Sequence, residues 1–279
     1  MNPILCYPGG KRGLKKEILK RIPPHDTYIE PFVGGGSVFF AKPRAKKEII
    51  NDKDKDLIDF YKACRRPDVS FKKANLRASR ERYEKYKKSK PKTPQSKVNR
   101  FLYLNKRSFG GVMNNGYYAP STAKTKGKGG GQEGIKKIGR EQQDRLRGVK
   151  IENRDFEKVI KDYDNKNAFI YMDPPYYGES RGLYKHDDRS ATPERVLQAA
   201  ARAKGKCLVS YNDCPEVRKI ARKLGLYIYQ VRTKYSLNSA SNNKDKTELL
   251  ISNYPMRNGK PVKTKTGRGQ TIKRDINGH

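Results

Sequence analysis

Short apolar runs alternate with helical patterns along most of the chain, and this alternation restricts the fold more than any other feature. Seven runs have the length and composition of buried strands. They are residues 27–30, 48–51, 149–152, 168–172, 207–211, 226–233 and 248–253. Helical patterns between them cover residues 37–42, 55–62, 156–163, 193–202 and 215–224. This order predicts an α/β fold with a mostly parallel sheet covered on both faces. The last two runs are joined without a helix, which predicts an antiparallel final hairpin.

The positive charge is concentrated in one part of the chain. The formal net charge is +35, and residues 62–150 hold 26 of the 64 lysines and arginines. So large a charge repels itself unless a polyanion is near, and nucleic acid is the first expectation, ahead of an anionic membrane surface. Within this basic part, residues 71–90 and a helical face over residues 98–105 predict two helices in a small lobe. No apolar run is long enough for a transmembrane span, so we expect no membrane association through one.

The domain organisation follows from the same distribution. We expect a discontinuous, moderately charged scaffold domain over residues 1–61 and 149–254, with a very basic insert at 62–148. Residues 255–279 form a basic tail with almost no apolar periodicity, and we expect it to be disordered. The four cysteines form no CxxC pair and the three histidines lie far apart. We therefore expect no metal site and no disulfide framework, and a reducing cytoplasm fits. The N-terminus lacks the apolar stretch of a secretory signal.

Two motifs follow predicted strands. Glu30-Pro-Phe-Val-Gly-Gly-Gly-Ser37 comes after the first strand, where glycines let the backbone approach a ligand. By itself it is equally well a tight turn with Ser37 capping a helix. Asp173-Pro174-Pro175-Tyr176 ends the fourth strand and leaves an acceptor and an aromatic ring at the edge where open α/β sheets bind ligands. This pair suits a planar group with an amino substituent, although a rigid strand-ending turn is the alternative.

A third motif precedes the first helix, and together the three carry a resemblance. Residues 7–11 read YPGGK, followed by IEPFVGGGSVFF, INDKDKDLIDFY, RFLYLNKRSFGG, NRDFEKVI, FIYMDPPYY, LVSYND and TELLISNY. In this order they resemble the Dam-like, D12 class, alpha-group family of site-specific DNA adenine N6-methyltransferases. The resemblance covers most of residues 4–254. It implies a Rossmann-like seven-stranded methyltransferase sheet with a small, mainly helical DNA-recognition lobe.

The resemblance implies S-adenosyl-L-methionine as cofactor and assigns its contacts. The positions that match the family's cofactor motifs are Tyr7, Lys11, Phe32, Gly34, Gly36, Asp52, Asp155, Phe156 and Asp173. Asp52 follows the second strand, where an acidic side chain can accept hydrogen bonds from ribose hydroxyls. Asp155 precedes a helix and is equally well only an N-cap.

The implied catalytic residues are Asp173, Pro174 and Tyr176. The lone pair of adenine N6 is delocalised into the ring and is a poor nucleophile. Asp173 can accept one amino hydrogen and the Pro174 carbonyl the other, which localises that lone pair. Tyr176 would stack on an adenine that has left the duplex.

The insert is implied to bind double-stranded DNA. The candidate DNA-binding residues are Arg100, Asn105, Lys106, Arg107, Phe109, Asn114, Tyr117 and Tyr118. Lys97 is a further candidate phosphate contact. GATC-specific members place an arginine three residues after the glycine of FNG, whereas this chain has Asn114 at that place after Phe109-Gly110-Gly111. We therefore do not expect GATC specificity.

Two alternatives remain open. One is methylation of another exocyclic amine, on cytosine N4 or an RNA base, because the same acceptors suit any such group. The other is a catalytically idle DNA-binding relative. The resemblance otherwise implies a monomer without metal, either solitary or partnered with a restriction nuclease. We expect it to be cytoplasmic (bacterial, phage or host-cell nucleoid-associated).

Overall fold

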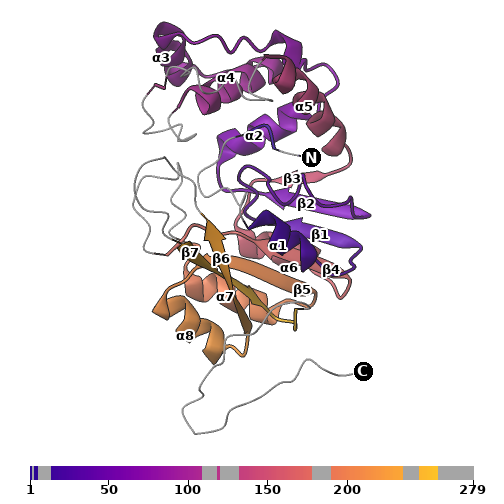
Figure 1. The fold of residues 1–279 in the computed structure, drawn as a ribbon. Helices are drawn as coiled ribbons and strands as arrows, with labels where there is room; N and C mark the ends of the chain where they lie inside the picture. The colour runs from indigo at the N-terminus through magenta and orange to yellow at the C-terminus, as the bar shows by residue number, and fades with distance from the viewer. Residues whose placement is uncertain are drawn as a thin grey trace, which may run out of the picture.

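A seven-stranded sheet forms the centre of the molecule (Figure 1). The computed structural model describes residues 1, 3–5, 14–108, 118–119, 132–177, 190–234 and 245–256. The strand order is β3-β2-β1-β4-β5-β7-β6, and β7 pairs antiparallel with both β5 and β6 while the other neighbours are parallel. The strands are β1 (Thr27–Glu30), β2 (Lys47–Asn51), β3 (Lys150–Glu152), β4 (Ala168–Met172), β5 (Lys206–Asn212), β6 (Tyr227–Lys234) and β7 (Asp245–Ser252). The seven predicted strands and the antiparallel end of the sheet are confirmed.

One face of the sheet is covered by three helices whose starts the sequence signals. They are α6 (Phe156–Tyr163), α7 (Pro193–Arg202) and α8 (Pro215–Lys223). The Thr192 side chain accepts a hydrogen bond from the Arg195 amide, and Pro193 occupies the first turn of α7, which is a favoured start for a helix. The apolar sides of α6, α7 and α8 pack with Ile29, Ile170 and Val209 in one buried cluster. These three helices therefore match their predicted ranges closely.

The opposite face carries α1 (Lys15–Lys20) and the segment after β1. The helix expected at residues 37–42 is wrong, because this stretch forms consecutive turns. The amides of Phe40 and Lys42 reach back four residues, but Pro43 follows at once. The segment lies between Gly36, whose backbone is in the left-handed region, and Pro43, which disfavours a helical conformation at the residue before it. It is therefore too short to form a helix.

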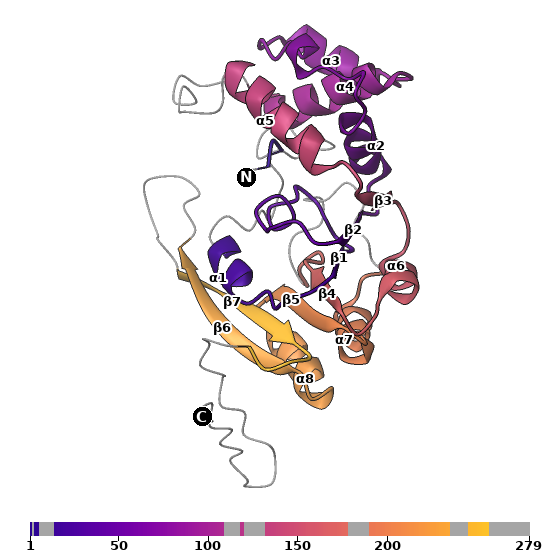
Figure 2. The same ribbon diagram turned by 90° about the vertical axis from the view of Figure 1, so that its right-hand side faces the viewer.

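A helical lobe lies beyond the β3 edge of the sheet (Figures 1 and 2). It contains α2 (Lys55–Cys64), η1 (Phe71–Lys73), α3 (Arg80–Lys88), α4 (Pro94–Arg107) and α5 (Gln132–Arg145). The continuous helix expected over residues 71–90 is wrong. The Asn75 side chain accepts the Arg77 amide in a local turn, and the Ser79 hydroxyl caps α3, so both side chains favour non-helical backbone between η1 and α3. Helix α5 was not expected from its glycine-containing, polar sequence.

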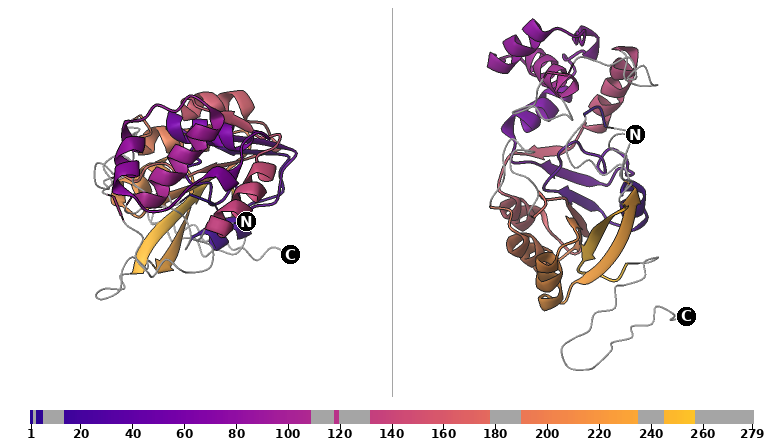
Figure 3. Two further views of the ribbon diagram at one scale, coloured as in Figure 1. Left: turned by 90° about the horizontal axis from the view of Figure 1, so that it is seen from above. Right: turned by 60° about the vertical axis from the view of Figure 1, so that its left-hand side comes forward.

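The lobe and the sheet share one hydrophobic core. The cluster on the α1 side of the sheet continues through α2 into α4, where the rings of Phe60 and Phe101 stack at 4.8 Å. The lobe lies beyond the β3 edge of the sheet, and the β6–β7 pair forms the opposite edge (Figure 3). Among the residues that the structure describes, none of the helices has the length and apolarity needed to cross a membrane.

Candidate active site

The strand order changes direction between β1 and β4, at the centre of the sheet. From β1 the chain proceeds towards β2 and β3, whereas from β4 it proceeds towards β5. The carboxyl ends of these parallel strands meet at one edge, and open α/β sheets bind ligands outside such a point. The segments that begin at Pro31, Asp52 and Asp173 each follow one of these strands. The structure therefore brings the motifs after β1, β2 and β4 to a common edge.

The glycine loop after β1 is held by Asp52, which directly follows β2, and by Tyr61 of α2. Gly34 and Gly36 have φ values of 45° and 70°, which side chains disfavour. The Gly34 amide donates to Asp52 Oδ2 at 2.9 Å, and the Tyr61 hydroxyl donates to the Gly34 carbonyl at 2.8 Å. Asp52 Oδ1 also accepts from the Asp54 amide at 2.9 Å. Burial raises the pKa of Asp52 to about 6 in spite of these donors.

An aromatic pair lies beside this loop. The rings of Phe32 and Phe156 are 5.1 Å apart, and the Arg195 guanidinium lies 5.0 Å from the Phe156 ring centre. Phe156 is 1% exposed and Phe32 is half-buried, so Phe32 is the ring that a ligand can reach. Asp155 Oδ1 accepts from the Glu157 amide at 3.0 Å, which makes Asp155 the N-cap of α6. Asp155 also forms an ion pair with Arg195.

Asn51 is a residue at this edge that the sequence did not single out. Its buried amide nitrogen donates to the carbonyls of Pro31 and Arg154 at 2.9 and 3.1 Å, and its oxygen accepts from the Arg154 amide at 2.8 Å. Asn51 therefore joins the segments after β1 and β3. The available signal was a polar side chain that ends an otherwise apolar strand.

Asp173 lies at the end of β4 and is bound from the neighbouring strand. The Ser210 hydroxyl on β5 donates to Asp173 Oδ1 at 2.9 Å. The buried Tyr171 hydroxyl lies 2.9 Å from the same serine oxygen. Burial raises the pKa of Tyr171 well above its usual range, so its hydroxyl stays protonated. Neither Tyr171 nor Ser210 was predicted to belong to the site.

Tyr176 is turned into the protein. Its hydroxyl donates to Glu248 Oε2 at 2.6 Å, and its ring is stacked on Tyr211 at 6.1 Å and 22°. Tyr176 is 9% exposed, whereas the next residue, Tyr177, is 48% exposed. The Asn212 side chain donates to the Tyr177 carbonyl at 2.9 Å. The segment after Asp173 is thus fixed at its side chains and at its backbone.

Glu30 ends β1 and lies behind the glycine loop. It is 2% exposed, and Tyr28 donates to its Oε2 at 2.6 Å. Burial, with a contribution from the negative charge of Asp173, raises the pKa of Glu30 to about 8. A carboxyl at this edge is therefore mostly protonated at neutral pH.

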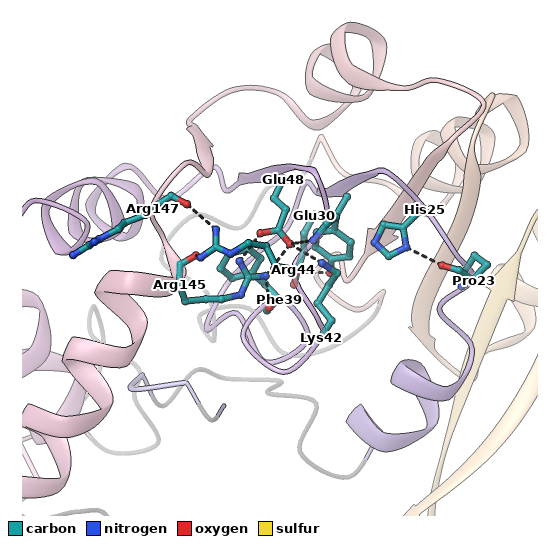
Figure 4. Close-up of polar contacts among 11 residues, drawn as sticks. Pro23, His25, Glu30, Phe39, Lys42, Arg44, Glu48, Arg145 and Arg147 are labelled. Carbon is teal, nitrogen blue, oxygen red and sulfur yellow. Dashed lines mark hydrogen bonds and ion pairs between the residues drawn. The ribbon is translucent and has the colours of Figure 1, made fainter.

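A buried ion network connects the glycine loop to α5 (Figure 4). Glu48 on β2 accepts from Lys42 at 2.6 Å and binds Arg145 at the end of α5 through both oxygens. Arg145 also donates to the Phe39 carbonyl at 3.1 Å, and Arg44 donates to the carbonyls of residues 144, 145 and 147. Arg145, which lies where the chain passes from the lobe back to the sheet, is thus fixed beside the turns that follow the glycine loop.

The structure uses several of the expected DNA-binding residues internally. Asn105 is 1% exposed, so its side chain lies inside the lobe and away from any DNA surface. Arg100 donates to the Tyr86 carbonyl and pairs with Asp56, and Lys97 pairs with Asp59. The guanidinium of Arg107 donates to the Leu76 carbonyl through two of its nitrogens.

The ends of the expected recognition hairpin lie together. Ser108 and Tyr118 form an antiparallel bridge, and the Ala119 amide donates to the Arg107 carbonyl at 2.8 Å. Tyr118 packs against Tyr83 at 5.5 Å, and Lys106 is half-buried. Tyr7, Lys11, Phe109, Asn114 and Tyr117 lie outside the described residues. Within the described ranges, histidine, cysteine and acidic side chains form no group that would hold a metal ion.

Comparison with known proteins identifies similar chains. The family model of the D12 class N6 adenine-specific DNA methyltransferases matches residues 7–237. The type II methyltransferase M.CviBI of Paramecium bursaria Chlorella virus NC1A is 26% identical over 91% of this chain and 100% of its own length. The type II methyltransferase M.MjaIII of Methanocaldococcus jannaschii is 31% identical over 63% of this chain and 69% of its own. Among solved structures, the precorrin-6y C5,15-methyltransferase of Geobacter metallireducens has a TM-score of 0.39 at 9% identity, covering 90% of this chain and 98% of that one.

Proposed function

The chain belongs to the D12 class of N6 adenine-specific DNA methyltransferases, and we propose that it methylates adenine within a specific short site in duplex DNA, after the base has left the helix. The observation that carries the proposal is the position of Asp173. This carboxylate directly follows β4 at the change of strand direction and accepts a hydrogen bond from Ser210, beside the loop that Asp52 supports. An acceptor for an amino hydrogen thus shares an edge with the loop that we propose binds the cofactor.

Membership of the family implies S-adenosyl-L-methionine as the methyl donor, and the residues at this edge fit it. When bound, this cofactor supplies a methyl group that a positive sulfur has already activated. The Asp52 carboxylate can accept from ribose hydroxyls, because its oxygens have further lone pairs beyond the two backbone donors. The reachable ring of Phe32 can pack on the adenosine, and the bend at Gly34 lets the ligand approach the backbone. We propose that Gly36, Asp155 and Phe156 support this site from the side.

Asp173 would activate the adenine amino group. By accepting one amino hydrogen, with the Pro174 carbonyl accepting the other, it draws the nitrogen towards tetrahedral geometry and localises its lone pair. The enzyme forms no covalent intermediate in this step, so positioning of the two reactants provides much of the acceleration. A hydrogen bond to a charged acceptor contributes roughly 1.5–3 kcal/mol, and more of it is realised as the nitrogen becomes positive.

Tyr176 would contact the base that has left the duplex. Stacking on an aromatic side chain contributes roughly 1–3 kcal/mol per base. One side of the Tyr176 ring faces Tyr211, so a base can stack only on what remains accessible. Tyr177 follows and is exposed. Comparing Tyr176→Ala with Tyr177→Ala would show which ring the base uses.

The basic insert at residues 62–148, which forms most of the lobe, would hold the DNA. It contains most of the excess positive charge, and Ser108 and Tyr118, which flank the segment that matches the family's recognition region, form an antiparallel bridge. Binding that depends on many phosphate contacts weakens steeply with salt. Because Arg100 and Arg107 have partners within the lobe, we propose that they stabilise its shape in addition to any phosphate contact.

The test is transfer of a labelled methyl group from S-adenosyl-L-methionine to unmethylated genomic DNA, followed by digestion to nucleosides. We expect label in N6-methyladenine with the wild type and none with Asp173→Ala. Asp26→Ala, which changes a half-buried acid just before β1 at the opposite edge of the sheet, should keep activity. Label in N4-methylcytosine would overturn the substrate and keep the mechanism. Measurable cofactor binding without label in DNA or RNA would indicate a catalytically idle relative.

A further inference from the structure

Three polar side chains on β5 and β7 hold the segment that contains Asp173. We name Ser210, Asn212 and Glu248 the β5–β7 bracket. Ser210 donates to the Asp173 carboxylate at 2.9 Å, and Asn212 donates to the Tyr177 carbonyl at 2.9 Å. Glu248 accepts from the Tyr176 hydroxyl at 2.6 Å. Each contact fixes a different point of residues 173–177.

Strand register explains why these three side chains lie together. Ser210 and Asn212 are two residues apart on β5, so they face the same side of the sheet. Glu248 on β7 is paired with Asn212 in the antiparallel ladder, which puts it on that side as well. Strand pairing therefore sets the relative positions of the three bracket residues, and no loop is needed to bring them together.

The contact of Ser210 with Asp173 has a defined direction. A serine hydroxyl has a single hydrogen, and an ionised carboxylate can only accept. Because Ser210 gives its hydrogen to Asp173 Oδ1, the Tyr171 hydroxyl must donate to the serine oxygen. Tyr171 is fully buried in β4, so this chain of donors is anchored in the core and selects one orientation of the Asp173 carboxylate.

The contact of Glu248 with Tyr176 fixes a ring. Both side chains are buried, and the hydroxyl lies at the far end of the ring from the backbone. A hydrogen bond at that end, with Tyr211 against one side of the ring, restricts rotation about both side-chain bonds. The nearby charges of Asp173 and Glu248 add to burial in raising the pKa of Tyr176 well above its usual range, so the hydroxyl remains a donor.

We propose that Ser210 and Glu248 are positioning residues for methyl transfer. Ser210 orients the Asp173 carboxylate towards the amino group, and Glu248 orients the Tyr176 ring towards the base. The inference rests on the proposed function of Asp173 and Tyr176. In this proposal neither Ser210 nor Glu248 touches the reacting atoms, so each acts through the residue that it holds.

The first experiment compares Ser210→Ala with Ser252→Ala. Both serines are fully buried on adjacent strands, but Ser252 donates to the Tyr254 carbonyl, away from Asp173. We expect Ser210→Ala to lower kcat about 10- to 100-fold, which corresponds to loss of one charge-assisted hydrogen bond. The Kd for S-adenosyl-L-methionine and the thermal unfolding midpoint should match those of Ser252→Ala. Equal kcat values for the two variants would overturn the role of Ser210.

The second experiment is a double-mutant cycle between Glu248 and Tyr176. Glu248→Gln keeps an acceptor and should retain kcat within about threefold, whereas Glu248→Leu should lose about 10- to 100-fold. If Glu248 acts through the Tyr176 hydroxyl, adding Tyr176→Phe to Glu248→Leu should produce no further loss. Losses that multiply would show that Glu248 acts elsewhere and would overturn its role.

The assay uses the same labelled transfer to genomic DNA and scores whichever methylated base the wild type produces. If the wild type is active, Asp173→Ala is inactive and Ser210→Ala is fully active, the positioning role of Ser210 is refuted and the proposed function of Asp173 stands. A wild type that transfers no methyl group would refute the proposed function, and the bracket with it.

Discussion

Glu30→Gln is expected to change how the stability of the protein depends on pH. Glu30 is buried at the end of β1, and burial raises its pKa to about 8 from an ordinary value of 4.5. Between these two pH values the folded protein keeps a proton that the unfolded chain has released. The free energy of unfolding must therefore fall as pH rises across this window, and the loss is complete above about pH 8.

The size of the effect follows from the difference between the two pKa values. At roughly 1.4 kcal/mol per pH unit, full ionisation of Glu30 in the folded protein costs about 5 kcal/mol, and about 3 kcal/mol is lost by pH 7. Glutamine has nearly the same shape as a protonated glutamate and can still accept from the Tyr28 hydroxyl. The variant should thus equal the wild type near pH 4.5 and exceed it increasingly towards pH 8.

The measurement is urea unfolding of both proteins at several pH values between 4.5 and 8.5, followed by circular dichroism. Glu17→Gln provides the control, because Glu17 lies on the surface of α1 and its hydrogen bond with Arg21 lowers its pKa. The free energy of unfolding of Glu17→Gln, relative to that of the wild type, should not increase as pH rises. If the difference between wild type and Glu30→Gln stays constant from pH 5 to 8, Glu30 is ionised in the folded protein and the reasoning from burial is wrong.

Three further variants test the edge of the sheet and its connection to the lobe. Asp52→Asn should raise the Kd for S-adenosyl-L-methionine about tenfold or more, measured by calorimetry, with kcat nearly unchanged; unchanged affinity would remove Asp52 from the cofactor site. Gly36→Ala should lower the free energy of unfolding by about 2–4 kcal/mol, since φ is 70° and the added carbon would lie 2.7 Å from the Phe40 ring; a midpoint equal to that of wild type would contradict this. Arg145→Met should lower the free energy of unfolding by about 3 kcal/mol, because Glu48 then keeps Lys42 as a cationic partner but loses the bidentate contact with Arg145. A variant more stable than the wild type would show that the ion network serves a purpose other than stability.

Local patterns were sufficient to predict the seven strands of the sheet. A strand such as β4 is buried on both faces, so its five residues are apolar without interruption and end at a proline pair. Helix α7 has a threonine cap and a proline in its first turn, and its predicted and observed ranges coincide. These signals depend on neighbours in sequence, which is why they can be interpreted without the fold. The helix expected at residues 37–42 failed because the pattern of its apolar residues arises from turns packed on the sheet.

The residues that hold the site could not be predicted in this way. Ser210 lies 37 positions from Asp173, and Glu248 lies 72 positions from Tyr176. Nothing near either residue in the sequence indicates its partner, because the contact depends on the order and register of strands far apart in the chain. The same limit applies to Arg100, whose positive charge indicates a phosphate contact in the sequence but is paired with Asp56 in the fold.

The antiparallel strand explains how an acidic residue reaches this edge from β7. In a parallel sheet, only residues at the carboxyl ends of strands face the ligand edge, and each strand can contribute only its last residues there. Because β7 runs in the opposite direction beside β5, its first half lies at that edge, and Glu248 is paired with Asn212 at the end of β5. A reversed strand therefore supplies a side chain from a regular, fully hydrogen-bonded element, which is more rigid than a loop. Leu249→Pro would remove a ladder hydrogen bond next to Glu248. Loss of this rigidity should reduce kcat by more than it changes the affinity for the cofactor.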